Sequence, residues 1–201
     1  MVKKMYGWEN YDANAEFYFN SYINLSFENI FSDVMAFLPM QGSKCLDIGA
    51  GSGRDAAALT KLGYEVTAVE PSDGMRSLAI KYHEGLPISW IKDSLPLLTT
   101  LTSNKESFDL ILMSAVWMHL NNNDRLTALH TVNKLLSSQG IFILTLRLGA
   151  ADPDRNIFEI SLNEAIDKAV KSGFVVKYIN PVKGDSLNRA SVKWQILVFS
   201  K

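Results

Sequence analysis

The feature that most constrains this chain is a glycine-rich segment between residues 44 and 56. It begins with a short apolar run, which is followed by glycines at three alternate positions. A helical pattern then runs from Asp55 to Leu62, and Gly63 ends it. Glycine tolerates positive φ and lets a ligand touch bare backbone, while the amides of a helix N-terminus favour a negative group. The segment therefore predicts a buried strand, a tight turn and a helix that hold a nucleotide-like ligand or a carboxylate.

Two groups of nucleotide-binding proteins share this arrangement. Residues 51–56 fit the dinucleotide fingerprint G-x-G-x-x-G/A, whose ligand is NAD or a related cofactor. Residues 47–53 have the form Asp-x-Gly-x-Gly-x-Gly and resemble motif I of the class I S-adenosylmethionine (SAM) methyltransferases. In that family the glycine turn lies under the methionine part of SAM, and the acidic residue helps to orient its amino group. Asp47 thus favours SAM, and NAD stays open as the alternative.

The second predicted strand ends in an acidic residue. Residues 64–69 alternate and then become apolar, and Glu70, Pro71 and Ser72 follow. A carboxylate at this strand end can accept hydrogen bonds from both ribose hydroxyls, which suits SAM as well as NAD. Glu70 is therefore the predicted ribose-binding residue, and the alternative is a solvated acid at a strand end.

Strand and helix patterns alternate along the rest of the chain. Further strands are predicted at 87–91, 108–115, 141–146, 174–179 and 192–200, and further helices at 73–83, 124–139 and 162–171. Alternation predicts a parallel sheet with helices on both faces, and the short link between the last two strands makes one of them antiparallel. The class I methyltransferases have seven strands, the last inserted antiparallel, so the resemblance extends from residue 44 onward. The expected fold is an α/β, Rossmann-like three-layer sandwich with a seven-stranded, mostly parallel sheet, one antiparallel strand near the C-terminus and a helical N-terminal lid, in a single domain of residues 1–201.

Residues 1–40 precede the first strand and are the predicted lid segment. Residues 11–22 are rich in aromatic side chains at helical spacing, and residues 27–38 carry an amphipathic helical stripe. The run Tyr-Asp-x-x-Ala-x-x-Tyr that opens the first of these stretches resembles the N-terminal segment of many small-molecule SAM methyltransferases, which folds over the cofactor. The resemblance implies that Tyr11 and Tyr18 face the sulfonium and the substrate. The segment is then expected to be mobile without ligand, and the alternative is that its aromatics only pad the sheet.

The same resemblance implies a set of cofactor-binding residues on the lid and at the strand ends. They are Tyr18, Asp47, Gly49, Ala50, Gly51, Arg54, Glu70, Pro71, Met75, Asp93, Ser94 and Ser114. Asp93 follows the third strand, where the family places a polar residue against the adenine amino group; the alternative is a loop acid in water. Arg54 follows the last glycine and is a candidate partner of the SAM carboxylate or of an acidic substrate, the alternative being a surface charge.

His119 is the only histidine near the end of the fourth strand, where open α/β sheets bind substrates. It is the candidate catalytic residue, as a general base or an orienting group, and the alternative is a histidine that packs at a helix entry. His83 and His130 fall within predicted helices and are expected at the surface. No group of His, Cys, Asp and Glu has the spacing of a metal site, and Ser114 is not in a G-x-S-x-G turn, so neither a metal nor a serine nucleophile is expected.

Composition narrows the expected partners. The 201 residues include 20 Lys and Arg against 21 Asp and Glu, a net charge of −1 without a basic stripe, so no nucleic-acid partner is expected. Residues 114–117 are Ser-Ala-Val-Trp, where family members that methylate nucleic-acid amino groups carry an Asn/Asp-Pro-Pro-aromatic run. The apolar stretch 110–118 is too short to span a bilayer, and Cys45, the single cysteine, can form no intrachain disulfide. A cytoplasmic protein without a membrane partner is expected.

These observations predict a SAM-dependent methyltransferase that transfers a methyl group to a small-molecule acceptor by in-line displacement. SAM is the expected cofactor and S-adenosylhomocysteine the expected product. The alternatives are an NAD(P)-dependent oxidoreductase and a SAM-fold protein that methylates or binds a protein or RNA.

Overall fold

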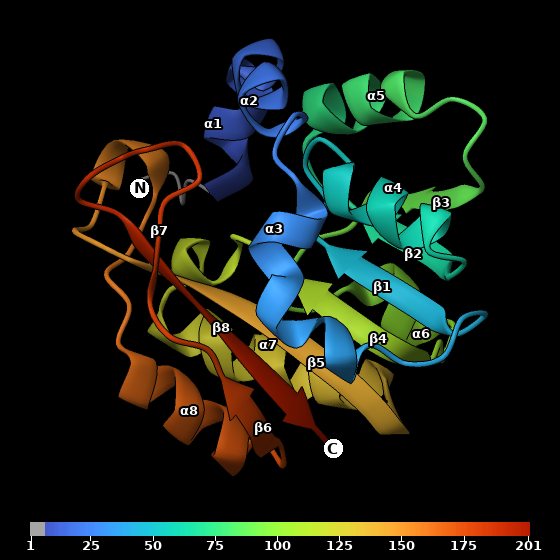
Figure 1. The fold of residues 1–201 in the computed structure, drawn as a ribbon, viewed down its shortest axis with the longest axis vertical. Helices are drawn as coiled ribbons and strands as arrows, with labels where there is room; N and C mark the ends of the chain where they lie inside the picture. The colour runs from blue at the N-terminus through green and yellow to red at the C-terminus, as the bar shows by residue number, and fades with distance from the viewer. Residues whose placement is uncertain (1–6) are drawn as a thin grey trace.

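A computed structural model describes residues 7–201, and its centre is a single sheet (Figure 1). The strands are β1 (Lys44–Ile48), β2 (Glu65–Val69), β3 (Ile88–Ile91), β4 (Phe108–Met113), β5 (Leu136–Leu148), β6 (Val175–Ile179), β7 (Lys183–Gly184) and β8 (Lys193–Ser200). They are ordered β3-β2-β1-β4-β5-β8-β6, with β7 paired to β8. The neighbours from β3 to β5 run parallel, whereas β8 is antiparallel to β5 and β6. The predicted Rossmann-like α/β fold with an antiparallel strand near the C-terminus is confirmed.

The strand count differs from the prediction, because the described residues form eight strands and not seven. The extra strand, β7, consists only of Lys183 and Gly184 and pairs with Trp194 and Lys193 of β8. Two residues are too few to show a hydrophobic period, so the sequence indicated only a turn at this point.

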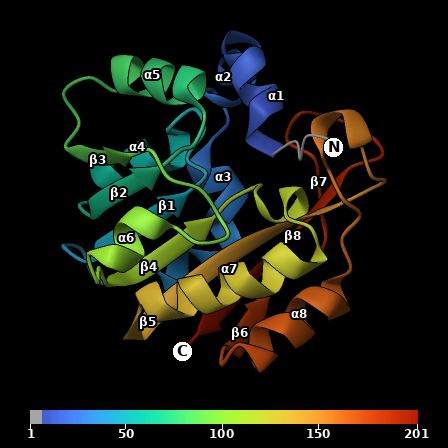
Figure 2. The same cartoon turned by 180° about the vertical axis from the view of Figure 1, so that it is seen from behind.

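Helices cover both faces of the sheet and complete the three layers (Figures 1 and 2). One layer contains α3 (Phe27–Phe31), the 3-10 helix η1 (Ser32–Phe37) and α4 (Arg54–Lys61), and the other contains α6 (Thr99–Ser103), α7 (Asn122–Leu135) and α8 (Leu162–Lys171). Successive residues of a strand pack against opposite layers: Cys45 packs with α3 and α4, and Leu46 packs with α7. The sheet is therefore a rigid base for the loops at its carboxyl ends. No helix within residues 7–201 is both long and apolar enough to cross a membrane.

The boundary between α7 and β5 differs from the prediction. Asn121 caps α7 by accepting a hydrogen bond from the amide of Asp124, so the helix starts before Asp124. The strand begins at Leu136, directly after the helix, instead of at Ile141. Gly140, the predicted helix stop, lies inside β5, where a Cβ atom would come within 2.7 Å of the Leu136 side chain. The glycine thus permits close packing beside the register shift between β4 and β5.

The predicted lid is built from two short helices, α1 (Gly7–Ala13) and α2 (Ala15–Tyr22), which pack against α5 (Asp73–Tyr82). The two helices break at Asn14, and the stripe over 27–38 forms α3 and η1 instead of one helix. Residues 1–6 of the predicted lid segment lie outside the described residues. Figure 1 shows α1 and α2 beyond the carboxyl ends of the parallel strands, where they adjoin the candidate site.

Candidate functional site

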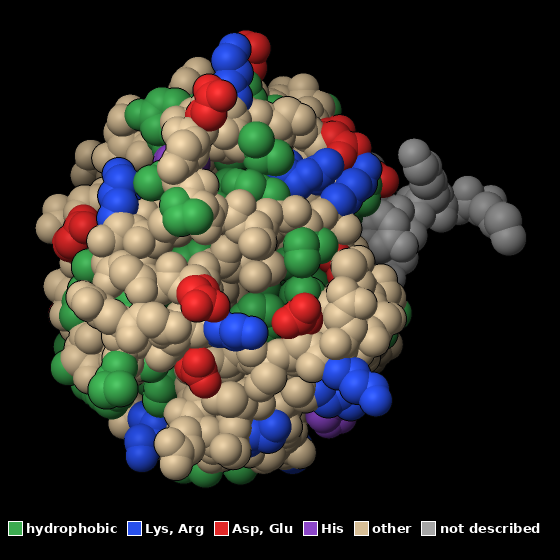
Figure 3. All heavy atoms as spheres, turned by 90° about the vertical axis from the view of Figure 1, so that its right-hand side faces the viewer, with side chains coloured by type: hydrophobic (Ala, Val, Ile, Leu, Met, Phe, Trp, Pro, Cys, Tyr) green, Lys and Arg blue, Asp and Glu red, His purple; other side chains and the backbone are tan. Residues whose placement is uncertain are grey.

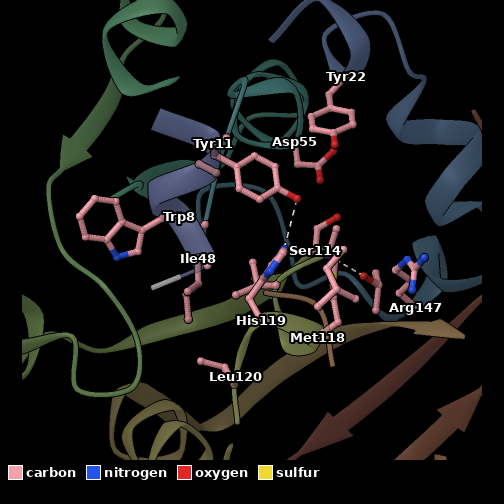
Figure 4. Close-up of a pocket in the computed structure, with 18 of the residues that line it drawn as sticks. Trp8, Tyr11, Tyr22, Ile48, Asp55, Ser114, Met118, His119, Leu120 and Arg147 are labelled. Carbon is pink, nitrogen blue, oxygen red and sulfur yellow. Dashed lines mark hydrogen bonds between the residues drawn. The ribbon is translucent and has the colours of Figure 1, made fainter. Parts of the chain in front are cut away.

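A cavity of about 420 Å³ opens at the carboxyl ends of the parallel strands. Residues that follow β1, β2, β3 and β4 line one part of it. Other parts are lined by α1, the end of α2, α3, β5, the loop between β5 and α8, and the segment between β6 and β8. Figure 4 shows Tyr11 and His119 pointing toward each other inside it, with Arg147 on the β5 side. Both the volume and the position are typical of small-molecule sites in open α/β sheets.

The glycine turn after β1 forms one edge of the cavity. Gly49, Gly51 and Gly53 all have positive φ, at 71°, 54° and 73°, as the sequence pattern implied. The amides of Gly49 and Ala50 donate to the carbonyl oxygen of Val69 at 2.8 and 2.9 Å, which fixes the turn against the end of β2. A Cβ atom on Gly51 would meet nothing closer than 3.7 Å, so a ligand can approach this backbone directly.

Glu70 connects the glycine turn to the end of β2. Its Oε2 accepts a hydrogen bond from the Gly51 amide at 2.8 Å, and its Oε1 accepts one from the Ser72 amide at 2.9 Å. Burial raises the pKa of this carboxyl to about 7, against the opposing effect of the two amides. Each oxygen retains a second lone pair beside the cavity, so Glu70 can accept two hydroxyl donors such as those of a ribose.

Asp47 and Arg54 lie differently from their predicted roles. Asp47 is buried and is not among the cavity-lining residues, and burial followed by the charge of Asp55 holds the pKa of its carboxyl well above the ordinary value. Its Oδ2 has no hydrogen-bond partner among the described residues. Arg54 lines the cavity, but its Nε and Nη2 donate to the two carboxylate oxygens of Asp55 at 2.6 and 2.7 Å. The predicted pairing of Arg54 with a ligand carboxylate therefore competes with a partner inside the chain.

The remaining residues of the predicted set all line the cavity: Ala50, Pro71, Met75, Asp93, Ser94 and Ser114. Asp93 accepts hydrogen bonds from the amides of Ser94 and Thr100, each at 2.8 Å, so its carboxylate also holds the loop that leads into α6. Ser114 follows β4 and precedes Ala115, whose φ is 56°. Four neighbouring strands thus bring residues from distant parts of the sequence to one edge.

Tyr18 does not line the cavity, in contrast to its predicted contact with the cofactor. Its ring lies behind the rings of Tyr11 and Tyr22, with centroids 4.5 and 5.9 Å away, and its hydroxyl donates to Asn10 at 2.7 Å. Tyr11 of α1 and Tyr22 at the end of α2 line the cavity instead.

His119 ends the 3-10 helix η2 (Trp117–His119) and lies at the cavity wall, as predicted from its position after β4. Its Nδ1 is 3.2 Å from the carbonyl oxygen of Asn156, and its Nε2 is 3.2 Å from the hydroxyl of Tyr11. A carbonyl only accepts, so Nδ1 carries the hydrogen and Nε2 accepts from Tyr11. Burial lowers the pKa of His119 to about 4, and the ring is neutral at physiological pH.

The other two histidines differ from each other. His130 is exposed, as expected from its helix position. His83 is half-buried and its Nε2 lies 3.0 Å from the carbonyl oxygen of Ser52, so the expectation of a surface histidine was wrong. A tertiary contact with the loop before α4 buries this ring, and no local pattern indicates it.

Among the cavity residues that sequence reasoning missed are Tyr22, Arg147 and Arg155. Arg155 belongs to the 3-10 helix η3 (Pro153–Arg155), and its Nη2 donates to the hydroxyls of Tyr11 and Tyr22 at 3.1 and 3.4 Å. Nothing in the local sequence of this loop indicates that position. Arg147 near the end of β5 did carry a signal, because it is a charged residue in a buried strand that ends at the same edge as the others.

On the face shown in Figure 3, acidic and basic side chains alternate with apolar ones and no large patch of one sign is present. Within residues 7–201, no three His, Cys, Asp or Glu side chains gather closely enough to hold a metal ion.

Comparison with known proteins agrees with this geometry. Residues 46–144 match the methyltransferase domain family. An uncharacterized methyltransferase of Bacillus pumilus is 28% identical over 140 residues, which are 66% of this chain and 57% of that protein, so the chain spans little more than half of the relative's length.

Solved structures share the fold over most of the chain. A TehB-like SAM-dependent methyltransferase of Corynebacterium glutamicum has a TM-score of 0.67 at 21% identity, covering 96% of this chain and 97% of that one. A Haemonchus contortus phosphoethanolamine N-methyltransferase 2, solved with phosphomonomethylethanolamine and S-adenosylhomocysteine, has a TM-score of 0.71 at 17% identity, covering 94% of this chain and 57% of that one. Together with the glycine turn and the strand-end carboxylate, the match of residues 46–144 and the shared fold support a class I SAM-dependent methyltransferase.

Proposed function

We propose that this chain transfers a methyl group from SAM to a small-molecule acceptor by in-line displacement. The observation that carries the proposal is the junction of Glu70 with the glycine turn, where a buried carboxylate and bare backbone border the same cavity. Carboxylate oxygens that retain lone pairs suit the two ribose hydroxyls of an adenosine cofactor. The family match and the shared fold support the same cofactor.

The residues around the cavity divide into two groups. The glycine turn, Glu70 and Asp93 lie at the ends of β1 to β3 and would hold the cofactor. When bound, SAM supplies an electrophilic methyl group on a sulfonium, and its product is a neutral thioether. Because the leaving group needs no proton, the protein's task is to align the acceptor and exclude water, and orientation can contribute about 7–11 kcal/mol.

The lid helices support a small acceptor. Tyr11 and Tyr22 line the cavity from α1 and α2, so the lid helices form part of its wall. Aromatic faces also attract a cation such as a sulfonium. His119 is neutral, and both of its ring nitrogens are in hydrogen bonds. We therefore propose that it orients Tyr11 and the acceptor. A pKa near 4 makes it too weak a base to be an effective general base.

The cofactor preference is directly testable. S-adenosylhomocysteine is expected to bind the full chain at micromolar concentrations in isothermal titration calorimetry, and NADH is not, because the acidic residue ahead of the glycine turn and the antiparallel β8 are features of the SAM family. The same protein is expected to convert SAM to S-adenosylhomocysteine when it is offered a pool of small metabolites. Tighter binding of NADH than of S-adenosylhomocysteine would reverse the assignment.

The lid is expected to move with the ligand. Asp12 on α1 accepts hydrogen bonds from the Ser72 hydroxyl and the Gly74 amide, each at 2.8 Å, and so fastens the lid to α5. Asp12→Ala is expected to speed amide hydrogen exchange over residues 8–25 in the ligand-free protein by roughly tenfold, the effect of losing charge-assisted bonds. S-adenosylhomocysteine is expected to slow exchange there in the wild type. Glu16→Ala, at an exposed position of α2, is the matched control, and equal exchange in all three proteins would argue against a lid.

A further inference from the structure

The cavity contains an imbalance of charge on its β5 side. Among the described residues, the arginines that line it are Arg54, Arg147, Arg155 and Arg189. Arg54 is paired with Asp55, and Arg189 is paired with Asp185 through two bonds of 2.8 and 2.7 Å. Arg147 and Arg155 form no ion pair with any carboxylate of residues 7–201.

Arg147 is the more costly of these two charges to bury. Its side chain lies on β5 with 8% of the residue exposed, its Nη1 donates to the carbonyl oxygen of Ala150 at 3.0 Å, and its Nε has no partner among the described residues. Burial, and then the charges of Arg189 and Arg155, lower its pKa, against the weaker pull of Asp152 and Asp185. A buried guanidinium with a single neutral partner is unfavourable unless something else compensates for its charge.

Arg155 reaches the same side of the cavity from η3. The hydroxyls of Tyr11 and Tyr22 accept from its Nη2, and the ring of Tyr18 lies 5.4 Å from its Cζ. These contacts hold the guanidinium in place without neutralising it, and its Nε is also buried without a partner. Two fixed guanidinium groups therefore border one space, and each has an N–H group that no described residue satisfies.

We propose that the β5 side of the cavity binds an anionic group of the methyl acceptor, a carboxylate or a phosphate, between Arg147 and Arg155. This inference rests on the proposed methyltransferase function. A planar guanidinium binds either anion through parallel hydrogen bonds, and a low-dielectric site strengthens them. The anion would lie away from Glu70 and the glycine turn, so cofactor and acceptor would occupy opposite sides of the cavity and would each be anchored separately.

The test is a titration of the full chain saturated with S-adenosylhomocysteine. The probes are inorganic phosphate, benzoate and the neutral benzamide. Phosphate and benzoate distinguish a phosphate site from a carboxylate site, and benzoate and benzamide have similar shapes but differ in charge. Phosphate or benzoate is expected to bind at about 1 mM, and benzamide is not. Arg147→Gln and Arg155→Gln are each expected to weaken anion binding roughly tenfold or more, because each removes one charged hydrogen-bonding partner. Lys171→Gln, which removes the same charge from the exposed end of α8, is expected to leave binding unchanged.

The outcomes separate this inference from the proposed function. Unchanged S-adenosylhomocysteine affinity in Arg147→Gln shows that the variant is folded and that the arginine does not serve the cofactor carboxylate. If Arg147→Gln does not fold, Arg155→Gln, on the separate element η3, carries the test. If S-adenosylhomocysteine binds but neither anion does up to about 10 mM, or if the anion binds the arginine variants as it binds the wild type, the inference is overturned and the methyltransferase assignment stands. A wild type that binds no S-adenosylhomocysteine overturns the proposed function itself.

Discussion

Glu70→Gln is expected to weaken S-adenosylhomocysteine by about 1.5–3 kcal/mol, the cost of losing hydrogen bonds to a charged acceptor. The substitution retains the shape of the side chain but replaces one acceptor oxygen with an amide group that cannot accept. Both carboxylate oxygens already receive backbone amides from Gly51 and Ser72, and the ribose hydroxyls would use the lone pairs that remain. Calorimetry measures the change, and Glu65→Gln, at the exposed start of β2, is the matched control.

The pKa of Glu70 gives this prediction a second readout. Burial raises that pKa to about 7, so the ligand-free carboxyl is partly protonated at neutral pH. Ribose hydroxyls donate to the charged form, and binding therefore favours it. Affinity in the wild type is expected to fall by up to about tenfold per pH unit as the pH decreases below 7, and to level off above 8.

The same shift has the opposite sign for the stability of the ligand-free protein. Because the folded pKa of Glu70 lies above the ordinary glutamate value, its contribution to the free energy of unfolding decreases as the pH rises through 7.

Glu70→Gln is expected to flatten the pH dependence of S-adenosylhomocysteine binding. If the Glu70→Gln variant binds S-adenosylhomocysteine as tightly as the wild type and with the same pH profile, Glu70 does not bind the cofactor.

Gly49→Ala is expected to destabilise the protein by about 2–5 kcal/mol and to abolish S-adenosylhomocysteine binding. Gly49 has a φ of 71°, which is unfavourable for alanine, and a Cβ atom at this position would collide with Cγ2 of Val116. Relief of the collision requires the glycine turn or the loop after β4 to move, and both border the cavity. Urea denaturation measures the stability, and calorimetry measures the binding.

Matched variants separate the two causes of this loss. Gly85 has a φ of 90°, and a Cβ atom there would meet nothing within 4 Å, so Gly85→Ala carries only the backbone cost of about 1–2 kcal/mol. Adding Val116→Ala to Gly49→Ala removes the colliding methyl group and is expected to restore part of the stability. If the two glycine variants lose equal stability, the packing of Gly49 against Val116 is not what requires a glycine there.

The sequence alone predicted the elements whose signals are local. The glycine turn is one continuous segment with its own spacing, and Glu70 stands directly after a recognisable strand. Parallel strands bring their carboxyl ends to one edge, so the sequence alone predicts that Asp93, Ser114 and His119 lie near the turn. The structure puts all three at the cavity wall.

The features that the sequence did not indicate depend on distant contacts. Arg155 reaches the cavity from a loop, and its position is set by hydroxyl groups more than a hundred residues earlier in the chain. Tyr18 was predicted at the site from the resemblance of its segment to a family lid, but its hydroxyl bonds to Asn10 and its ring packs against Tyr11 and Tyr22. Gly140 follows a helical pattern and was therefore predicted to end the helix. In the structure it lies within β5, where it allows the Leu136 side chain to pack closely against the backbone.

The central claim is that this cavity holds SAM across the glycine turn and Glu70, and a crystal structure of the complex with S-adenosylhomocysteine tests it most directly. The account predicts ribose hydroxyls hydrogen-bonded to the Glu70 carboxylate, the methionine part over the backbone of Gly49 to Gly51, and the adenine beside Asp93. Arg147 would remain without contact to the ligand. An adenosine bound elsewhere, or a ligand carboxylate on Arg147 with Glu70 untouched, would contradict the account.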